Sequence, residues 1–231
     1  MKKFKYQHIV TENYLKLEAA VREAMEFKLF LLVFGDSGYG KSFTYSDLAK
    51  KSDNSIVHLE IEKTDRPVEL YNKVISTFPA YDNYRSTSIR WTIEKAADLY
   101  NEKRSPSVLI IDEANQFKPN MLGFIRQFRD KTEYSTGLII SGPEEFHQEL
   151  IDWKDARVKG INEFWTRKDD VITIDPPSCE DLKNICIANS IEDIGIINDL
   201  IDASEGNYRG LRKQIEKYYR NLGYQIVQEA A

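Results

Sequence analysis

The chain has 231 residues, enough for one large domain or for a large domain with a small appendage. Its 42% apolar and 30% charged residues are ordinary for a globular protein, and its net charge of −5 excludes a chain-wide basic surface for nucleic acid. No apolar stretch approaches the roughly 20 residues that cross a bilayer, and the N-terminus lacks the apolar segment of a secretory signal. We therefore expect an intracellular, cytoplasmic protein without a membrane partner. Two cysteines are too few for a disulfide framework or a zinc site.

Short apolar runs alternate with helix-favouring stretches along the chain up to residue 174. The apolar runs cover residues 29–34, 56–61, 108–111, 138–140 and 171–174. The helical stretches between them cover 41–51, 67–78, 88–101, 120–131 and 143–152. Near-continuous apolar strands are typical of a parallel sheet that is covered on both faces. The alternation predicts an α/β fold with a five-stranded parallel sheet flanked by helices.

After Asp175 and two prolines the pattern changes to helices only. Ser178 and Asp181 resemble a capping box that opens one helix, and two further helices are predicted over 191–203 and 208–225. Three helices in so short a segment make a small C-terminal all-helical subdomain. The expected domains are an N-terminal helical extension over 1–28, an α/β core over 29–176 and the helical subdomain over 177–231.

The first predicted strand leads into GDSGYGKS, which fits the phosphate-loop pattern G-x-x-x-x-G-K-[ST] between a strand and a helix. Glycines allow the backbone to approach an anion closely, and successive N–H groups at a helix N-terminus can hold phosphate. Lys41 is expected to reach the β- and γ-phosphates, and the Ser42 hydroxyl to bind Mg²⁺. The residues expected to contact the nucleotide are Gly35, Asp36, Ser37, Gly38, Tyr39, Gly40, Lys41, Ser42 and Phe43.

A second motif ends the third predicted strand, where Asp112 and Glu113 follow the apolar run. An Asp at a strand end beside the phosphate loop can hold Mg²⁺, so Ser42 and Asp112 are the predicted metal-binding residues. Glu113 can orient and polarise an attacking water, which a phosphate-transferring kinase needs less. The two motifs together predict an ATP hydrolase that uses ATP and Mg²⁺.

With these motifs, the segments GLIISG and EGNYRGLRKQIEK make nearly the whole chain resemble the AAA+ ATPases, which are P-loop NTPases with a helical lid. The resemblance implies that Ser141 is the polar sensor at the end of the fourth strand. It also implies that Arg209 lies near the γ-phosphate and lets the lid move with the nucleotide. Members of this superfamily usually take an arginine from a neighbouring subunit. Arg167 fits that role best and Arg157 is the alternative, although a solvated surface charge explains either equally well.

Within that superfamily, the segment from IDEANQF to GPEEF is similar to the transposition ATPases of the phage Mu B and TnsC/TniB type. The positions that carry the similarity are Phe124, Arg126, Arg129, Asp130, Thr132 and Gly142. It implies a homo-oligomer, such as a helical filament, on double-stranded DNA, with target-site selection and stimulation of a partner transposase in DNA transposition and recombination. A helicase loader or another protein-remodelling AAA+ ATPase is the alternative. A P-loop kinase fits less well because Glu113, Ser141 and Arg209 suit a hydrolytic site.

Two basic segments are candidates for sequence-independent contact with DNA phosphates. The predicted DNA-binding residues are Arg85, Arg90, Lys103 and Arg104, which alternate with aromatic residues in a region that faces DNA in related filament-forming ATPases. The alternative is the stripe of Arg209, Lys213, Lys217 and Arg220 on the last helix, for which a solvated face is an equal explanation. His58 in the second strand is either a switch residue near the γ-phosphate or, more commonly, a sheet histidine whose polar atoms are satisfied.

Overall fold

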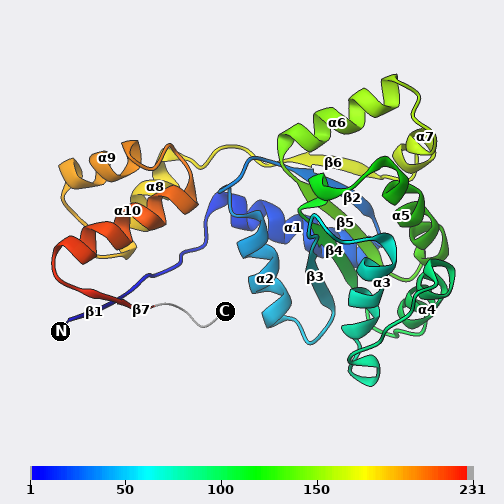
Figure 1. The fold of residues 1–231 in the computed structure, drawn as a ribbon. Helices are drawn as coiled ribbons and strands as arrows, with labels where there is room; N and C mark the ends of the chain where they lie inside the picture. Colours follow the sequence, from blue (N-terminus) through cyan, green and yellow to red (C-terminus); the bar gives the residue numbers. More distant parts are fainter. Residues whose placement is uncertain (1, 228–231) are drawn as a thin grey trace. The chain divides into compact units, whose positions relative to one another are not determined.

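The computed structural model describes residues 2–227 (Figure 1). The chain divides into two compact units. The larger, which we call the sheet unit, comprises Leu17–Gly35 and Ser42–Thr173. The smaller, which we call the helical unit, comprises Met1–Lys16, Asp36–Lys41 and Ile174–Ala231. No helix within residues 2–227 combines the length and the apolar character that a membrane span needs.

The sheet unit contains the predicted five-stranded parallel sheet, in the order β3-β4-β5-β2-β6. Its strands are β2 (Phe30–Phe34), β3 (Ile56–Glu60), β4 (Val108–Asp112), β5 (Gly137–Gly142) and β6 (Asp170–Thr173). Every residue of β2, β4 and β5 is buried, whereas β3 and β6, at the two sides of the sheet, are partly exposed. Each fully buried Leu, Ile or Phe side chain contributes about 1.5–3 kcal/mol to folding. The apolar runs in the sequence therefore form the centre of the core, and the α/β prediction is confirmed.

Helices connect successive strands (Figure 1). They are α1 (Glu12–Phe27), which precedes β2, then α2 (Lys41–Lys51), α3 (Pro67–Ser76), α4 (Ile89–Asn101), α5 (Pro119–Thr132), α6 (Glu144–Asp155) and α7 (Ile161–Trp165), with 3-10 turns η1 (Pro79–Tyr81) and η2 (Ala114–Gln116). Helix α3 packs on α4, α4 on α5 and α5 on α7. Within this layer Tyr100 contacts Phe128 edge-on, and Tyr71 contacts the same ring at a tilt of 44°. The helix predictions are confirmed to within a few residues, except that the short α7 was not predicted.

The helical unit contains α8 (Cys179–Ala188), α9 (Ile194–Asp202) and α10 (Tyr208–Asn221). It also holds a two-stranded parallel sheet of β1 (Lys3–Lys5) and β7 (Gln225–Val227), which the sequence did not predict. Phe4 of β1 stacks on Tyr219 of α10, with 3.8 Å between ring centroids. The last helix was predicted to reach residue 225, but it ends at Asn221. Gly223 has φ of +82°, a left-handed conformation that terminates helices and turns the chain into β7.

The start of α8 departs from the predicted capping box. Ser178 caps the helix as predicted, since its Oγ accepts the Asp181 N–H at 3.1 Å. The Asp181 carboxylate accepts instead from the Glu12 N–H at 3.1 Å and from the Tyr208 hydroxyl at 2.9 Å. Asp181 thus ties the first residue of α1 and the first residue of α10 to α8.

Candidate functional site

The phosphate loop folds tightly on its own backbone. Gly38 and Gly40 have φ of +89° and +94°, which only glycine adopts without strain, and such turns aim successive N–H groups into a concavity that suits an anion. The Lys41 ammonium donates to the Asp36 carbonyl at 3.2 Å, and Lys41 is only 9% exposed. The Tyr39 hydroxyl donates to the Asp36 carboxylate at 3.3 Å, so the bulky ring folds back on the loop itself.

The first turn of α10 contacts this loop within the helical unit. The Tyr208 N–H donates to the Gly38 carbonyl at 3.0 Å, and Arg209 Nη1 donates to Ser37 Oγ at 2.8 Å. A Cβ on Gly38 would lie 2.6 Å from Asn207 Oδ1, so no side chain fits there. The structure therefore brings Arg209 to the phosphate loop and adds Asn207 and Tyr208, which the sequence reasoning missed.

Asn13 is a second contact of the loop that the sequence did not reveal. Its amide donates to the Tyr39 carbonyl at 3.3 Å and to the Asp175 carbonyl at 2.9 Å, and it is 6% exposed. A lone Asn near the N-terminus belongs to no motif, so only the fold shows its position. Of the other residues expected to contact the nucleotide, Gly35 donates its N–H to the Gly142 carbonyl at 3.3 Å, and Phe43 is 42% exposed in the first turn of α2.

The two predicted metal-binding residues meet at the carboxyl edge of the sheet. Ser42 Oγ donates to Asp112 Oδ2 at 2.6 Å, and Asp112 is only 1% exposed. Burial raises the pKa of the Asp112 carboxyl, but the neighbouring polar groups of His58, Ser42 and Ser141 lower it, and the pKa lies below its ordinary value. Asp112 is therefore held as a carboxylate at neutral pH, the form that binds a cation.

Several buried polar atoms around Asp112 have no hydrogen bond to another described residue. Within residues 2–227, His58 Nε2, Ser141 Oγ and the Tyr45 hydroxyl reach no group in hydrogen-bond geometry. His58 Nε2 lies 3.5 Å from Asp112 Oδ2, and its side chain is 8% exposed. His58 thus faces the Asp112 carboxylate across the sheet, and its Nε2 has no hydrogen bond to a described residue. Buried polar groups of this kind call for an ion, a water or a ligand.

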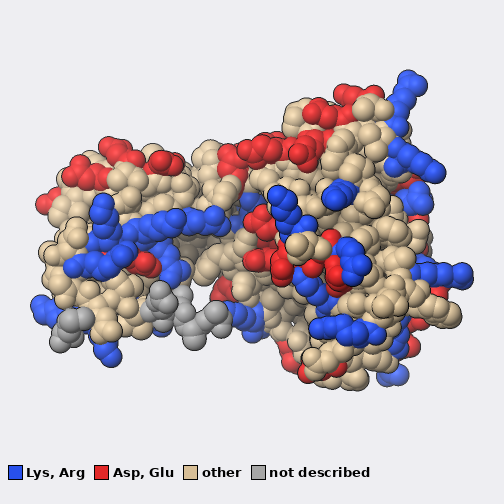
Figure 2. Space-filling model, viewed as in Figure 1, with Lys and Arg blue, Asp and Glu red and all other residues tan. Residues whose placement is uncertain are grey.

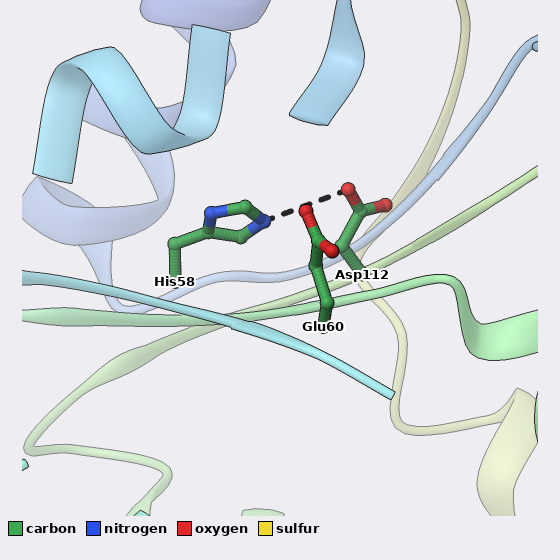
Figure 3. Close-up of side chains that lie close together, drawn as sticks. All are labelled: His58, Glu60 and Asp112. Carbon is green, nitrogen blue, oxygen red and sulfur yellow. Dashed lines mark ion pairs between the residues drawn. The ribbon is translucent and has the colours of Figure 1, made fainter. Parts of the chain in front are cut away.

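Glu60 joins the same cluster, in which the ligand atoms of His58, Glu60 and Asp112 all lie within 4.8 Å of one another. Figure 3 shows the three side chains pointing toward a common point. Parallel pairing places Glu60 beside Asp112, and His58 lies two residues earlier on the same face of β3. The sequence reasoning missed Glu60 because a single acid at the end of a strand carries no motif.

Glu113, the predicted water-orienting residue, directly follows β4. It is exposed and has φ of +56°, a left-handed conformation that costs a residue with a Cβ about 1–3 kcal/mol. Such strain is retained where the surrounding structure needs it, and it is common at functional sites. Ser141 is fully buried in β5, in register with Val33 of β2.

Arg167 is not brought together with the other site residues of the sheet unit. It lies between α7 and β6, and its Nε donates to Asp130 Oδ1 at 2.9 Å. Two residues further on, Asp169 accepts the N–H of Phe30, the first residue of β2. Arg167 therefore lies at the amino edge of the sheet and not at the carboxyl edge that holds Asp112. Arg157 is exposed just after α6, with φ of +54°.

The four predicted DNA-binding residues fall into two separate pairs. Arg85 and Arg90 lie near the start of α4, whereas Lys103 and Arg104 follow its end, about 20 Å away along a helix of 13 residues. Arg90 is paired with Glu94 at 3.3 Å. Lys103 donates to the Asn54 carbonyl at 2.8 Å and lies over an aromatic ring, and burial lowers its pKa. These residues therefore do not form one continuous basic surface.

The alternative stripe on α10 is continuous. Its four residues are exposed, and the opposite face of the helix buries Leu211, Ile215 and Tyr219. Figure 2 shows Lys and Arg side chains gathered over this helix. The stripe residues are Arg209, Lys213, Lys217 and Arg220.

Several solved structures share the fold of this chain. The Aeropyrum pernix Orc1 protein in complex with DNA has a TM-score of 0.67 at 10% identity, over 96% of this chain and 64% of that one. The Pyrobaculum aerophilum Cdc6p has 0.67 at 13%, over 94% and 64%. The replication initiator DnaA, bound to AMPPCP and single-stranded DNA, has 0.59 at 13%, over 92% and 63%. The chain thus spans less than two thirds of each, and at such identity the likeness concerns the fold alone.

No curated protein matches the sequence. The profile of the AAA domain family matches residues 25–150, which is more than half of the chain and includes the phosphate loop, β3, β4 and β5. The chain belongs to the AAA domain family.

Proposed function

We propose that the protein is a Mg²⁺-dependent ATPase whose nucleotide state controls assembly on DNA. The observation that carries the ATPase is the 2.6 Å contact between the Ser42 hydroxyl and the Asp112 carboxylate. These are two hard oxygen donors of the kind Mg²⁺ prefers. Bound there, Mg²⁺ would neutralise charge on the β- and γ-phosphates. In this proposal residues 29–176 are the nucleotide-binding core and 177–231 the lid.

Each predicted residue has a separate role in this proposal. The loop residues 35–43 bind the phosphates through backbone N–H groups, and Lys41 exchanges its contact with the Asp36 carbonyl for the β- and γ-phosphates. Glu113 orients the attacking water and accepts its proton. The Ser141 hydroxyl, which is buried and unpartnered, senses the γ-phosphate.

Arg209 reports the nucleotide state to the helical unit. Its contact with Ser37 holds α10 to the phosphate loop, and a guanidinium that exchanges this hydroxyl for a phosphate oxygen gains a charge-assisted hydrogen bond. The helix would therefore respond to binding and hydrolysis.

Arg167 acts on a neighbouring subunit in this proposal. Its place at the amino edge of its own sheet suits a group that works in trans, where a cation stabilises the charge of the transition state and makes hydrolysis depend on assembly. Its partner Asp130 would have to release it. Arg157 stays the alternative.

For the biological role we propose a DNA-bound homo-oligomer, such as a filament, that selects target sites and stimulates a transposase in the cytoplasm. The similarity in and after the Asp112 strand to the transposition ATPases supports this role. So do two structural neighbours, Orc1 in complex with DNA and DnaA bound to single-stranded DNA. A helicase loader is the second candidate, because DnaA is a replication initiator of the same fold.

The test combines phosphate release with electron microscopy of the full chain, with and without duplex DNA of arbitrary sequence. We expect DNA-stimulated hydrolysis and filaments that require ATP. Lys41→Ala should lose nucleotide binding and both properties. Hydrolysis without DNA association in any nucleotide state would contradict the DNA role and favour protein remodelling, and absence of ATP binding would contradict the ATPase itself.

A further inference from the structure

We infer that His58, Glu60 and Asp112 form a binding site for a divalent transition-metal ion of the zinc and cobalt class. The three ligand atoms lie within 4.8 Å of one another, and His58 Nε2 is 3.5 Å from Asp112 Oδ2. Around a tetrahedral ion with bonds of about 2.0–2.1 Å, ligand atoms lie about 3.4 Å apart. The imidazole and the nearer carboxylate are thus already at the separation that one ion requires, and the exposed Glu60 can complete the set by rotating its side chain.

The backbone supports the three ligands rigidly. Glu60 and Asp112 are register partners on adjacent strands, and His58 is on the same face of β3 as Glu60 (Figure 3). Two carboxylates directly opposite each other on neighbouring strands repel. A cation between them turns this repulsion into attraction, which explains why an acid is placed beside an almost fully buried Asp112.

The burial of His58 also supports a metal site. Its side chain is 92% buried, since 8% of it is exposed, and Nε2 faces Asp112 without reaching hydrogen-bond geometry with any described residue. A buried nitrogen that lacks a hydrogen bond costs stability, and a metal ion that takes its lone pair removes this cost. The Tyr45 ring, 5.6 Å from the imidazole between centroids, limits how far His58 can turn away.

The ligand set selects the metal. Mg²⁺ takes oxygen ligands and keeps several waters, whereas an imidazole suits zinc, cobalt and their neighbours. The site shares Asp112 with the proposed Mg²⁺ site but takes His58 and Glu60 in place of Ser42. A transition-metal ion here would draw Asp112 away from Ser42, so that the two modes exclude each other. The inference concerns the chain without nucleotide and does not depend on ATP hydrolysis.

The test is a titration of the metal-free full chain with Co²⁺, followed by the visible d–d absorption, in the absence of nucleotide. We expect one saturable Co²⁺ per chain, displaced by equimolar Zn²⁺ but not by a large excess of Mg²⁺. His58→Gln should weaken binding by at least about 100-fold, more than the loss of an outer-shell partner usually costs. Glu60→Gln, an exposed and isosteric change, should weaken it by about tenfold.

Two controls keep the test specific. Glu62→Gln removes an exposed acid two residues beyond Glu60, and His147→Gln removes a histidine that pairs with Glu144 instead. Neither should change the Co²⁺ spectrum or affinity. An unchanged spectrum in folded His58→Gln or Glu60→Gln protein, or displacement of Co²⁺ by Mg²⁺ at comparable concentration, would overturn the inference. If His58→Gln fails to fold by circular dichroism, Glu60→Gln decides.

Discussion

The two edges of the parallel sheet differ in how well their buried polar groups are hydrogen-bonded. At the amino edge the polar groups are paired. Arg129, which is 5% exposed, donates to the Thr136 carbonyl at 3.2 Å and lies 3.5 Å from the Asp169 carboxylate. That carboxylate also accepts the Phe30 N–H at 2.6 Å, and Ser107 Oγ donates to Thr136 Oγ1 at 3.1 Å.

At the carboxyl edge several buried polar groups around Asp112 lack hydrogen bonds to other described residues. Among the described residues, six buried side-chain polar atoms have no hydrogen bond, and those of Tyr45, His58 and Ser141 belong to this neighbourhood. The other three are on α3, α4 and α5. We infer from this difference that the polar contacts at the amino edge stabilise the sheet, whereas those at the carboxyl edge are available to a ligand. Open α/β sheets generally bind their ligands at the carboxyl ends of the strands.

The largest expected effect is on catalysis at the carboxyl edge. Glu113→Gln keeps the side-chain size but removes the carboxylate that we propose as the base, so ATP hydrolysis should slow by about 10²–10⁴-fold while ATP still binds. Phosphate release and nucleotide affinity measure the two effects. Because the side chain is exposed, the thermal midpoint should not fall. Normal turnover would show that Glu113 is not the base.

Arg129→Met removes the cation that pairs the polar groups at the amino edge. It leaves the Thr136 carbonyl and Asp169 without their cation and should cost about 2–3 kcal/mol of unfolding free energy. Urea unfolding should show a lower midpoint with an unchanged slope. A loss below about 0.5 kcal/mol would mean that the amino edge does not depend on this arginine.

Two serine substitutions compare the edges directly. Ser107 and Ser141 are both fully buried, but only the hydroxyl of Ser107 has a hydrogen-bond partner among the described residues. Ser107→Ala should cost about 1 kcal/mol, whereas Ser141→Ala should change stability by less than about 0.5 kcal/mol and lower ATP turnover. Equal losses of stability in the same urea experiment would remove the distinction between the edges.

A small effect on stability is expected at Arg167 as well. Its pair with Asp130 is exposed, so Arg167→Gln should leave the urea midpoint nearly unchanged. Its effect on turnover should nevertheless be large if the arginine acts in trans. Inactive Arg167→Gln subunits mixed with inactive Lys41→Ala subunits should then regain activity. No recovery, in mixtures verified to co-assemble, would exclude that role.

The sequence predicted the sheet well because β2, β4 and β5 are continuous apolar runs that are buried on both faces. It could not predict β1 and β7, since three-residue strands show no periodicity and their partners lie at opposite ends of the chain. The phosphate-loop motif and the strand that ends in Asp112 were enough to predict where Lys41, Ser42 and Asp112 lie in the fold.

The remaining contacts depend on tertiary structure. The position of Glu60 beside Asp112 can be predicted only when the register of β3 on β4 is known. The pairing of Arg167 with Asp130 likewise depends on how α5 packs against the segment before β6. Lys103, which composition marks as a basic surface residue, is held by the Asn54 carbonyl. None of these partners is close in sequence, so no local pattern could reveal them.

The pairing of β1 with β7 also sets an order of events during protein synthesis. Lys3–Lys5 leave the ribosome well before their partners Gln225–Val227. All strands of the sheet unit are complete by Thr173, so that unit can fold while the helical unit still waits for its last strand. The nascent chain therefore carries β1 unpaired until β7 has been made, and Lys3 and Lys5, exposed on either side of Phe4, are charges of the kind that discourage such a strand from pairing with other chains.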